Sequence, residues 1–366
     1  MTFETLDQHL CQLSEFEEYT RDYYLKHGYT LPEEEIPSQF LHGFTSPPND
    51  IRNILGIPLP PSGSMHFPLP PFFFEQQFFS EDMDIFIHRQ PRYSGNVFQA
   101  HAFYEVCYLY RGECKFILRS QTQEETVQLT TGDFIFIPPL MQHAAYVESD
   151  AIILNIGLRS STFARTFAHN IPDTSILGHF FSTLLDPKTP QLRYLTFHTK
   201  GDLALHQQVQ SLCLNYCNHT LYAPNITNLQ LTLLFLNLLQ NYSYNAKLST
   251  EGSVLAQRIP GILHYIEKNY STVTIKGLAH EFGYSEDYLN TVFKSVTGQT
   301  LRDTIMSLKM KKAGALLKSS LPVHSISLML GYKDTTNFIR NFKHHYGITP
   351  AQYRKKELGS SETSIL

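Results

Sequence analysis

The chain has 366 residues, of which 42% are hydrophobic and 13% aromatic, and its 29 basic and 33 acidic side chains give a net charge of −4. This apolar fraction is large enough to form packed cores and excludes a disordered chain, and the length predicts two or three domains. No apolar run of roughly eighteen residues exists and the acidic start of the chain lacks the features of a signal peptide, so we expect a cytoplasmic protein without a membrane partner.

The average charge conceals an uneven distribution along the chain. Residues 258–357 contain 15 Lys/Arg and 7 Asp/Glu, a net charge of +8, whereas residues 1–257 contain 14 Lys/Arg and 25 Asp/Glu, a net charge of −11. Such asymmetry favours a polyanionic partner for the basic part, although solvated lysine-rich helices would give the same excess. Charge alone leaves both interpretations open.

Residues 1–71 form an N-terminal extension to which the sequence assigns no role. Leu6 to Lys26 reads as one helix, and the proline-rich stretch from Pro58 to Pro71 predicts extended or irregular backbone.

A barrel is predicted over residues 72–165. Short runs of β-branched and aromatic residues are separated by turn residues, and Gly112 and Gly132-Asp133 mark hairpin turns. Evenly spaced short strands are typical of a small barrel or jelly roll. The predicted strands lie in residues 83–90, 103–112, 114–120, 126–139 and 151–158.

Polar residues at fixed spacing in this barrel resemble the two cupin motifs. The pattern is His101, Glu105 and Gly112, followed by Gly132-Asp133, a proline pair and His143. The resemblance implies a metal ion in enzymatic cupins, but Gln99 stands where the first histidine is expected. We therefore predict no metal, no other cofactor and no catalytic residue.

The same residues are predicted to form a ligand pocket, made of Gln99, His101, Glu105 and His143. Small barrels hold one small ligand, and aromatic residues either line the space or belong to the core. The aromatic candidates are Phe98, Phe103, Tyr104, Tyr108, Phe136 and Tyr146. Three alternatives stay open: the polar residues line or cap the barrel mouth, the barrel binds no ligand and only assembles dimers, or the barrel is a metal-dependent cupin enzyme fused to a DNA-binding domain.

Residues 166–245 are predicted as a helical segment, with helices over Leu203–His219 and Ile226–Tyr244. A leucine-rich stripe on the second helix, which includes Leu229 and Leu233, suits either packing on the barrel or a homodimer interface, and we favour the interface. The five cysteines contain no CxxC pair and are expected to be reduced, and Cys213 and Cys217 are expected to serve packing. The polar residues 246–257 are predicted as a linker.

Residues 258–357 contain an internal repeat that begins at Gly283-Tyr284 and again at Gly331-Tyr332. Apolar residues at helical spacing lie on both sides of each glycine, so each copy predicts a helix, a tight turn and a second helix. Ser285 and Asp334 are expected to cap the second helices. This arrangement is a helix-turn-helix, whose second helix lies in the major groove of DNA.

The second helix of each copy is predicted to contact double-stranded DNA. Asn pairs with adenine, Arg pairs with guanine, and an acidic side chain accepts from cytosine. One helix over Leu301–Ser319 would join the copies and separate them by about one DNA turn. The predicted contacts are Glu286, Asp287, Asn290, Thr291 and Lys294 in the first copy and Thr335, Thr336, Asn337, Arg340 and Lys343 in the second.

Residues 261–300 and 326–356 resemble the AraC/XylS family of bacterial transcriptional regulators, most specifically in the closing Gly347-Ile348-Thr349-Pro350. The resemblance implies an α+β multidomain protein: a cupin-like sensor barrel with a helical dimerisation segment, then an all-α domain with two helix-turn-helix motifs joined by a helix, and a tail over residues 358–366. It also implies promoter DNA, a small-molecule effector such as a sugar, a second copy and RNA polymerase as partners, and no enzymatic activity.

The sequence departs from the family pattern at the start of the first recognition helix. Glu286 and Asp287 stand where many relatives carry basic or aromatic groups. Because these acids repel phosphate, we expect the second copy to read DNA more strongly than the first.

Overall fold

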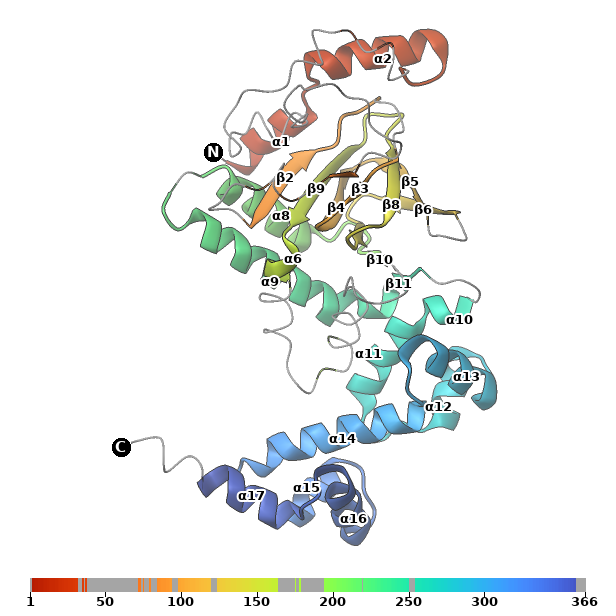
Figure 1. Ribbon diagram of the computed structural model, residues 1–366, viewed down its shortest axis with the longest axis vertical. Coiled ribbons are helices and arrows are strands. Elements are labelled where there is room, and N and C mark those ends of the chain that lie inside the picture. Colours follow the sequence, from red (N-terminus) through yellow and green to blue (C-terminus); the bar gives the residue numbers. More distant parts are fainter. Residues whose placement is uncertain are drawn as a thin grey trace. The chain divides into compact units, whose positions relative to one another are not determined.

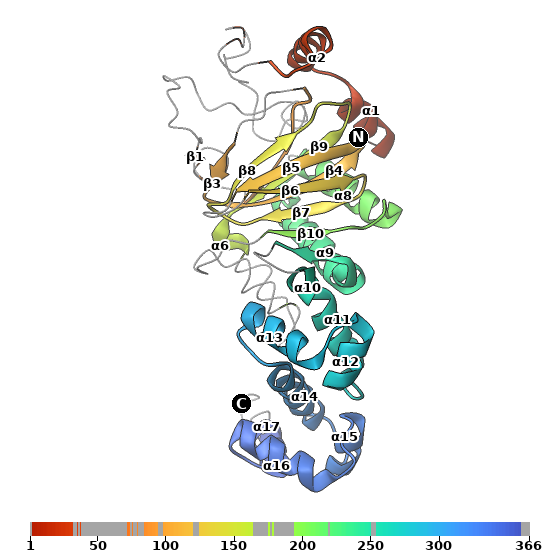
Figure 2. The same ribbon diagram turned by 90° about the vertical axis from the view of Figure 1, so that its right-hand side faces the viewer.

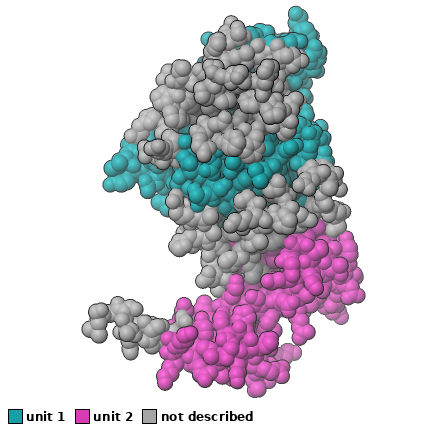
Figure 3. Space-filling view, viewed as in Figure 1, with its two compact units in different colours: residues 1–170, 182–251 teal, residues 171–181, 252–366 magenta. Residues whose placement is uncertain are grey.

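A computed structural model of the chain comprises two compact units (Figure 3), one formed by residues 1–170 and 182–251 and the other by residues 171–181 and 252–366. The first unit is rich in β-strands and the second is helical, which confirms the predicted α+β class. None of the described helices is long and apolar enough to cross a membrane. The structure describes residues 2–31, 84–93, 98–119, 124–163, 194–218, 220–249 and 254–359, together with isolated positions between 35 and 79 and at 175 and 178.

Two β-sheets form the centre of the N-terminal unit (Figure 1, Figure 2). The larger has the strand order β11-β10-β7-β4-β9-β2 and the smaller has the order β6-β5-β8, while β1 pairs in parallel with β3. The strands are β1 (Phe72–Phe73), β2 (Ile85–Arg89), β3 (Ala100–His101), β4 (Tyr104–Arg111), β5 (Glu113–Arg119), β6 (Glu124–Thr130), β7 (Phe134–Ile137), β8 (Gln142–Tyr146), β9 (Ile152–Leu158), β10 (Leu195–Phe197) and β11 (Lys247–Leu248).

All five runs predicted as strands form strands. The run 126–139 supplies both β6 and β7, because Gly132 turns the chain between them at a φ of 93°; Gly112, with a φ of 89°, does the same between β4 and β5. The strands β1, β3, β8, β10 and β11 were missed. Two of them, β10 and β11, lie in the stretches predicted as the helical segment and the linker, where they extend the edge of the larger sheet beside β7.

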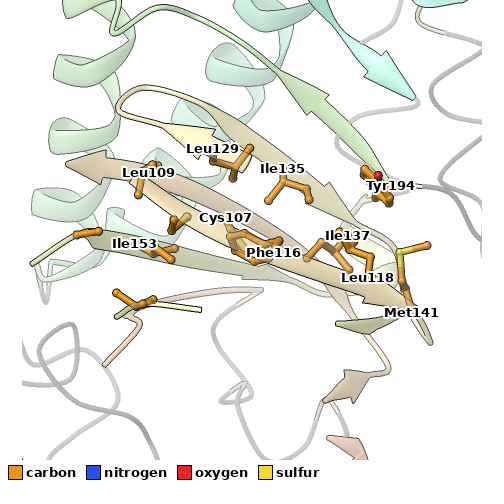
Figure 4. Packing of buried hydrophobic residues seen from close by; sticks show 13 residues of the cluster. Cys107, Leu109, Phe116, Leu118, Leu129, Ile135, Ile137, Met141, Ile153 and Tyr194 are labelled. Carbon is orange, nitrogen blue, oxygen red and sulfur yellow. The ribbon is translucent and has the colours of Figure 1, made fainter. Parts of the chain in front are cut away.

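Apolar side chains from both sheets fill the space between them (Figure 4). Cys107 of β4 lies directly opposite Ile135 of β7 and Asn155 of β9, so these three residues share the inner face of the larger sheet. Burial of each large side chain contributes about 1.5–3 kcal/mol. The core is formed by Cys107, Leu109, Cys114, Phe116, Leu118, Leu129, Ile135, Ile137, Met141, Val147, Ala151, Ile153 and Tyr194.

Two helices, α8 (Leu203–Tyr216) and α9 (Ala223–Tyr242), cover the outer face of the larger sheet, and the 3₁₀ turn η3 (Ser243–Asn245) follows them. The rings of Phe235 on α9 and Phe136 on β7 are 5.2 Å apart, and a 2.9 Å hydrogen bond joins His206 on α8 to Tyr108 on β4. The predicted helices over Leu203–His219 and Ile226–Tyr244 are therefore confirmed within a few residues.

Three of the aromatic residues considered for the pocket lie on this outer face. Tyr108 and Phe136 lie under α8 and α9, and Tyr104 stacks at 4.0 Å on Phe163 of α6 (Ser160–Phe163). They belong to the helix–sheet core and do not line the barrel.

Two helices, α1 (Phe3–Cys11) and α2 (Glu15–His27), begin the chain. The prediction of one helix over Leu6–Lys26 was wrong, because Ser14 starts a new helix. Its hydroxyl accepts from the Glu17 backbone N–H at 3.2 Å, while the Glu17 carboxylate accepts from the Ser14 N–H at 2.8 Å. This capping box separates α2 from α1.

The buried carboxylate of Glu17 also joins these helices to the barrel. It pairs with Arg89 of β2 and with Arg92, whose Nε lies 3.0 Å away. Arg89 donates further to the carbonyls of Leu10 and Gln12, at 2.6 and 2.7 Å, where α1 ends. Burial alone would raise the pKa of Glu17, but the Arg92 hydrogen bond and the Arg89 charge hold this pKa below its ordinary value of 4.5.

The C-terminal unit is a set of helices arranged along α14. The core of its second half contains Met310, Ala313 and Leu317 of α14 together with Phe338 and Phe342. The joining helix predicted over Leu301–Ser319 is confirmed. The described helices are α10 (Val254–Gln257), α11 (Ile259–Asn269), α12 (Ile275–Phe282), α13 (Glu286–Thr297), α14 (Leu301–Leu317), α15 (Val323–Met329), α16 (Thr335–Tyr346) and α17 (Pro350–Gly359).

Replacement of Glu17 tests its role as the attachment point. Glu17→Gln should destabilise the N-terminal unit by about 3–5 kcal/mol at neutral pH, because two buried guanidinium groups lose their counter-charge. Since the pKa of Glu17 is lowered in the folded state, its contribution is present above pH 4.5 and lost as the pH falls further, so the variant should lose less stability on acidification. Denaturant unfolding followed by circular dichroism at several pH values measures both effects.

The matched control for this experiment is Glu18→Gln, because Glu18 lies beside Glu17 in the first turn of α2 but is exposed. Equal stability and equal pH dependence in the two variants would contradict the assigned role of Glu17.

Candidate nucleic-acid interface and barrel site

Two helix-turn-helix motifs are present, one formed by α12 and α13 and the other by α15 and α16. The turns contain Gly283 and Gly331, with φ of 76° and 79°. Ser285 accepts from the Tyr288 N–H and caps α13, and Asp334 accepts from the Thr336 N–H at 2.9 Å and caps α16. The predicted turns and caps are confirmed.

The recognition helix of the first motif, α13, exposes acidic and polar side chains. Glu286, Asp287, Thr291 and Lys294 are exposed, whereas Asn290 is half-buried. The Asn290 carbonyl oxygen accepts from the Leu301 backbone N–H at 3.1 Å, so this side chain holds the start of α14. Of the five residues predicted to read DNA here, Asn290 therefore already has a structural partner.

The recognition helix of the second motif, α16, exposes a basic face. Thr336, Asn337, Arg340 and Lys343 are exposed, and Arg340 donates to the side-chain Oδ1 of Asn337 at 2.9 Å. Thr335 is half-buried, and its hydroxyl lies 2.9 Å from Nδ1 of His324 on α15.

The two recognition helices differ in charge. With histidines neutral, α13 has two acidic side chains and one basic side chain, and α16 has two basic side chains and no acidic ones. The acids lie in the first turn of α13, where the helix dipole stabilises them. Attraction to phosphate is therefore concentrated on the second motif.

The four residues predicted for the barrel pocket come together in the structure. Nε2 of His101 and Nε2 of His143 lie 3.2 and 2.9 Å from the same oxygen of Glu105, and all three side chains are buried. Gln99 lies beside them, with its Nε2 placed 3.2 Å from Nε2 of His143. The isolated bridge between Gln99 and His143 and the start of β4 position the group, which we call the His–Glu cluster.

Backbone carbonyls fix the orientation of both imidazoles. Nδ1 of His101 donates to the Phe103 carbonyl at 2.7 Å, and Nδ1 of His143 donates to the Met141 carbonyl at 3.1 Å. The Nε2 atoms then face a carboxylate, so each contact needs a proton or a cation, because two acceptors repel. Burial alone would raise the pKa of Glu105, but its hydrogen bonds to the two histidines hold this pKa well below the ordinary value.

This donor set has the chemistry of a metal site. Its ligand atoms all lie within 4.8 Å of one another, and histidine with carboxylate suits zinc, iron or manganese. Each imidazole also has the backbone partner that orients metal-bound histidines. The residues therefore fit a divalent ion as well as they fit a buried, protonated ion pair.

Two polar residues that were not predicted, His88 and Asn155, lie on the same inner face. Asn155 on β9 donates towards Nε2 of His88 on β2 at 3.2 Å and towards Gln90 at 2.9 Å. Burial lowers the pKa of His88 to about 4, so the ring is neutral at neutral pH. Nδ1 of His88 and Oδ1 of Asn155 have no partner within the described part of the chain. The alternation Phe86, His88 along β2 was the available signal.

Comparison with known proteins identifies both parts of the chain. Residues 85–212 match the family model of an AraC-like ligand binding domain, and residues 278–356 match that of a helix-turn-helix domain. The first match runs from β2 to α8 and includes the His–Glu cluster. The second runs from α12 to α17 and includes both motifs.

Relatives of the C-terminal part are bacterial regulators. The raffinose operon transcriptional regulatory protein RafR of Pediococcus pentosaceus is 38% identical over 93 residues, which are 25% of this chain and 34% of RafR. The regulatory protein SoxS of Escherichia coli is 34% identical over 85 residues, which are 23% of this chain and 79% of SoxS.

Among solved structures, the C-terminal domain of the response regulator yesN from Fusobacterium nucleatum is 35% identical, with a TM-score of 0.25, and the match covers 25% of this chain and 93% of that domain. The chain spans about a third of RafR and most of SoxS. With both family models matched in the expected order, the chain belongs to the AraC family of regulators.

Proposed function

We propose that this protein regulates transcription by binding double-stranded promoter DNA through both helix-turn-helix motifs, under the control of a small molecule held in the barrel. The observation that carries the proposal is the pair of capped recognition helices, α13 and α16, assembled on α14 in a segment with a net charge of +8. Bases would be read by Arg340 and Asn337 of the second motif and by Glu286 and Asp287 of the first.

The control step requires an effector that binds two arrangements of the protein with different affinity. The unpartnered atoms of His88 and Asn155 and the amide of Gln99 support a polar ligand with hydroxyl or amino groups. Sugars and other small metabolites are the first classes to test. Contact with RNA polymerase is the proposed step by which the bound protein changes transcription.

A second copy is the proposed partner of α9. Its buried face, which includes Phe235, packs on the sheet, but four apolar side chains in or next to the helix point to solvent. Their spacing of four, three and four residues forms one stripe, as in a two-helix seam. The stripe consists of Tyr222, Ile226, Leu229 and Leu233, which are 68%, 40%, 68% and 52% exposed.

The alternative function, a metal-dependent cupin enzyme attached to the DNA-binding domain, is favoured by one observation, the His–Glu cluster. The family to which the chain belongs consists of regulators, which supports the first proposal.

Removal of a base-reading side chain tests DNA recognition. Arg340→Ala should weaken binding by about 1–3 kcal/mol and relax base preference at one position, because a bidentate contact with guanine is lost. The measurement is fluorescence anisotropy at several salt concentrations with a duplex selected by the wild type. Glu286→Ala should raise the affinity for unrelated duplexes, since a charge that repels phosphate is removed, and should lower the preference for the selected duplex, since an acceptor for cytosine is lost.

The control is Lys355→Ala, which removes an equal charge from an exposed position of α17. Equal losses in Lys355→Ala and Arg340→Ala, without a change of base preference, would leave general charge as the explanation and contradict specific reading by Arg340.

The exposed stripe of α9 predicts a dimer, and acidic substitutions in the stripe should dissociate it. The double variant Leu229→Glu and Leu233→Glu should turn a dimer into a monomer in sedimentation velocity, because four carboxylates would meet in the seam, while the exposed positions leave folding intact. Leu25→Glu is the control, since Leu25 of α2 is 72% exposed but lies outside the stripe. A monomeric wild type, or a double variant that remains dimeric, would refute the interface.

The metal content of the His–Glu cluster distinguishes the proposed regulator from the alternative enzyme. For the regulator we expect no stoichiometric metal in purified protein, and we expect Glu105→Gln to lower stability by about 3–5 kcal/mol, because the buried counter-charge of two histidines is lost. Elemental analysis and thermal unfolding measure these outcomes. One zinc, iron or manganese ion per chain in the wild type, and none in Glu105→Gln, would favour the enzyme.

A further inference from the structure

The backbone segment that leads into the first motif touches the turn of the second. Ser271 lies between α11 and α12, and Gly331 lies between α15 and α16. A Cβ atom built on Gly331 would lie 1.7 Å from the Ser271 carbonyl oxygen and 2.7 Å from its carbonyl carbon. Two backbones are therefore in direct contact at this place, and any side chain at position 331 would force them apart.

The corresponding glycine of the first motif has no such neighbour. Gly283 has nearly the same positive φ as Gly331, but a Cβ atom built on it would meet nothing within 4 Å. Both turns need a residue that accepts positive φ, and only the turn of the second motif also needs the absence of a side chain.

Two lysines of α14 contact the residues around Ser271 and Gly331. Nζ of Lys309 lies 3.5 Å from the Ser271 carbonyl oxygen and 5.4 Å from the centre of the Tyr332 ring. Lys312 lies 4.7 Å from the centre of the Tyr270 ring, and Tyr270 packs on the core of the second motif. Lys309 is half-buried, so its ammonium group exchanges water for the carbonyl and the ring face.

These contacts give the two motifs a second connection. The first connection is α14, which carries the second motif on its C-terminal half and meets the first motif through the Leu301–Asn290 hydrogen bond. Each motif is joined to α14 through a short turn, at residues 298–300 and 318–322, so α14 alone leaves the orientation of each motif adjustable at these turns. The contact between Ser271, before the first motif, and Gly331, in the turn of the second, joins the two motifs directly. It therefore restricts changes in the orientation of one motif relative to the other.

We propose that Ser271, Lys309 and Gly331 form a positioning junction, which fixes the relative orientation of α13 and α16 and so sets one permitted spacing between the two DNA segments that these helices read. The proposal rests on the proposed function for its DNA consequence. Each added base pair moves one segment by about 3.4 Å and rotates it by roughly 35°. A fixed pair of helices cannot follow such a change, whereas a hinged pair can.

The first experiment measures spacing discrimination. A duplex selected by the wild type is compared with duplexes that carry one base pair more or less between the segments, and the quantity is the ratio of dissociation constants. We expect a ratio of at least tenfold for the wild type and of threefold or less for Gly331→Ala and Lys309→Met. Gly283→Ala should keep the wild-type ratio, and loss of a direct phosphate contact by Lys309 cancels in the ratio.

The second experiment needs no DNA and therefore separates failure of the junction from failure of the proposed function. Spin labels at Ser295→Cys of α13 and His344→Cys of α16, with Cys11 and Cys217 replaced by serine, report the distance distribution between the helices. We expect one narrow distribution in the otherwise unchanged chain and in Gly283→Ala, and a distribution at least twice as wide in Gly331→Ala and Lys309→Met.

The outcomes are distinguishable. Narrow distributions in Gly331→Ala and in Lys309→Met, with wild-type circular dichroism, would overturn the junction whatever the DNA result. Lys309→Met keeps the aliphatic stem, so it provides the test if Gly331→Ala does not fold. A broadened distribution without any sequence-specific DNA binding by the wild type would keep the junction and reject the proposed function.

Discussion

The C-terminal unit depends on one constraint: α14 has to bury different parts of its surface against two motifs. Its buried positions are therefore distributed around the helix and do not form a single stripe. Packing on α14 also explains Gly314. A Cβ atom at this position would lie 3.0 Å from the Tyr346 hydroxyl and 3.2 Å from the Tyr353 hydroxyl. A residue that weakens helix propensity by about 1 kcal/mol thus lets two tyrosines pack on the axis of the unit. The buried positions are Leu301, Thr304, Leu308, Met310, Ala313, Gly314 and Leu317.

The motifs were predictable because their signals are local. A turn glycine with positive φ and a cap that bonds two or three residues ahead are both read from a short window, and both were confirmed at Gly283 and Ser285. The structural role of Asn290 was not predictable, since its partner Leu301 belongs to the next helix. The contact between Gly331 and Ser271 joins positions sixty residues apart in sequence, and the repeat makes Gly331 look equivalent to Gly283. Only the tertiary contact separates the two glycines.

The barrel shows the same division between local and distant signals. The strands β2, β4, β5, β6, β7 and β9 lie in the predicted runs, whereas β8 was missed. The strands β10 and β11 are too short to carry a period, and they are strands because β10 pairs with the edge of β7 and β11 pairs with β10. The residues predicted for the pocket came from the resemblance to cupin motifs, and the structure brings them together; His88 and Asn155 lie on the same face through register across β2 and β9. Glu17 and Arg89 are 72 residues apart in the sequence, so the local sequence of the first helices does not predict their ion pair.

Charge and geometry together suggest how the two motifs divide the work under the proposed function. The acidic start of α13 repels phosphate, so the first motif adds little to general affinity, but its carboxylates accept hydrogen bonds from the amino groups of cytosine. The basic face of α16 supplies attraction that is independent of sequence. If the junction at Gly331 fixes one helix relative to the other, binding of the second motif delivers the acids of the first to one place in the groove. A carboxylate held there penalises every base without a donor, so the first motif adds discrimination with little affinity, while the second contributes affinity together with the base reading proposed for Arg340 and Asn337.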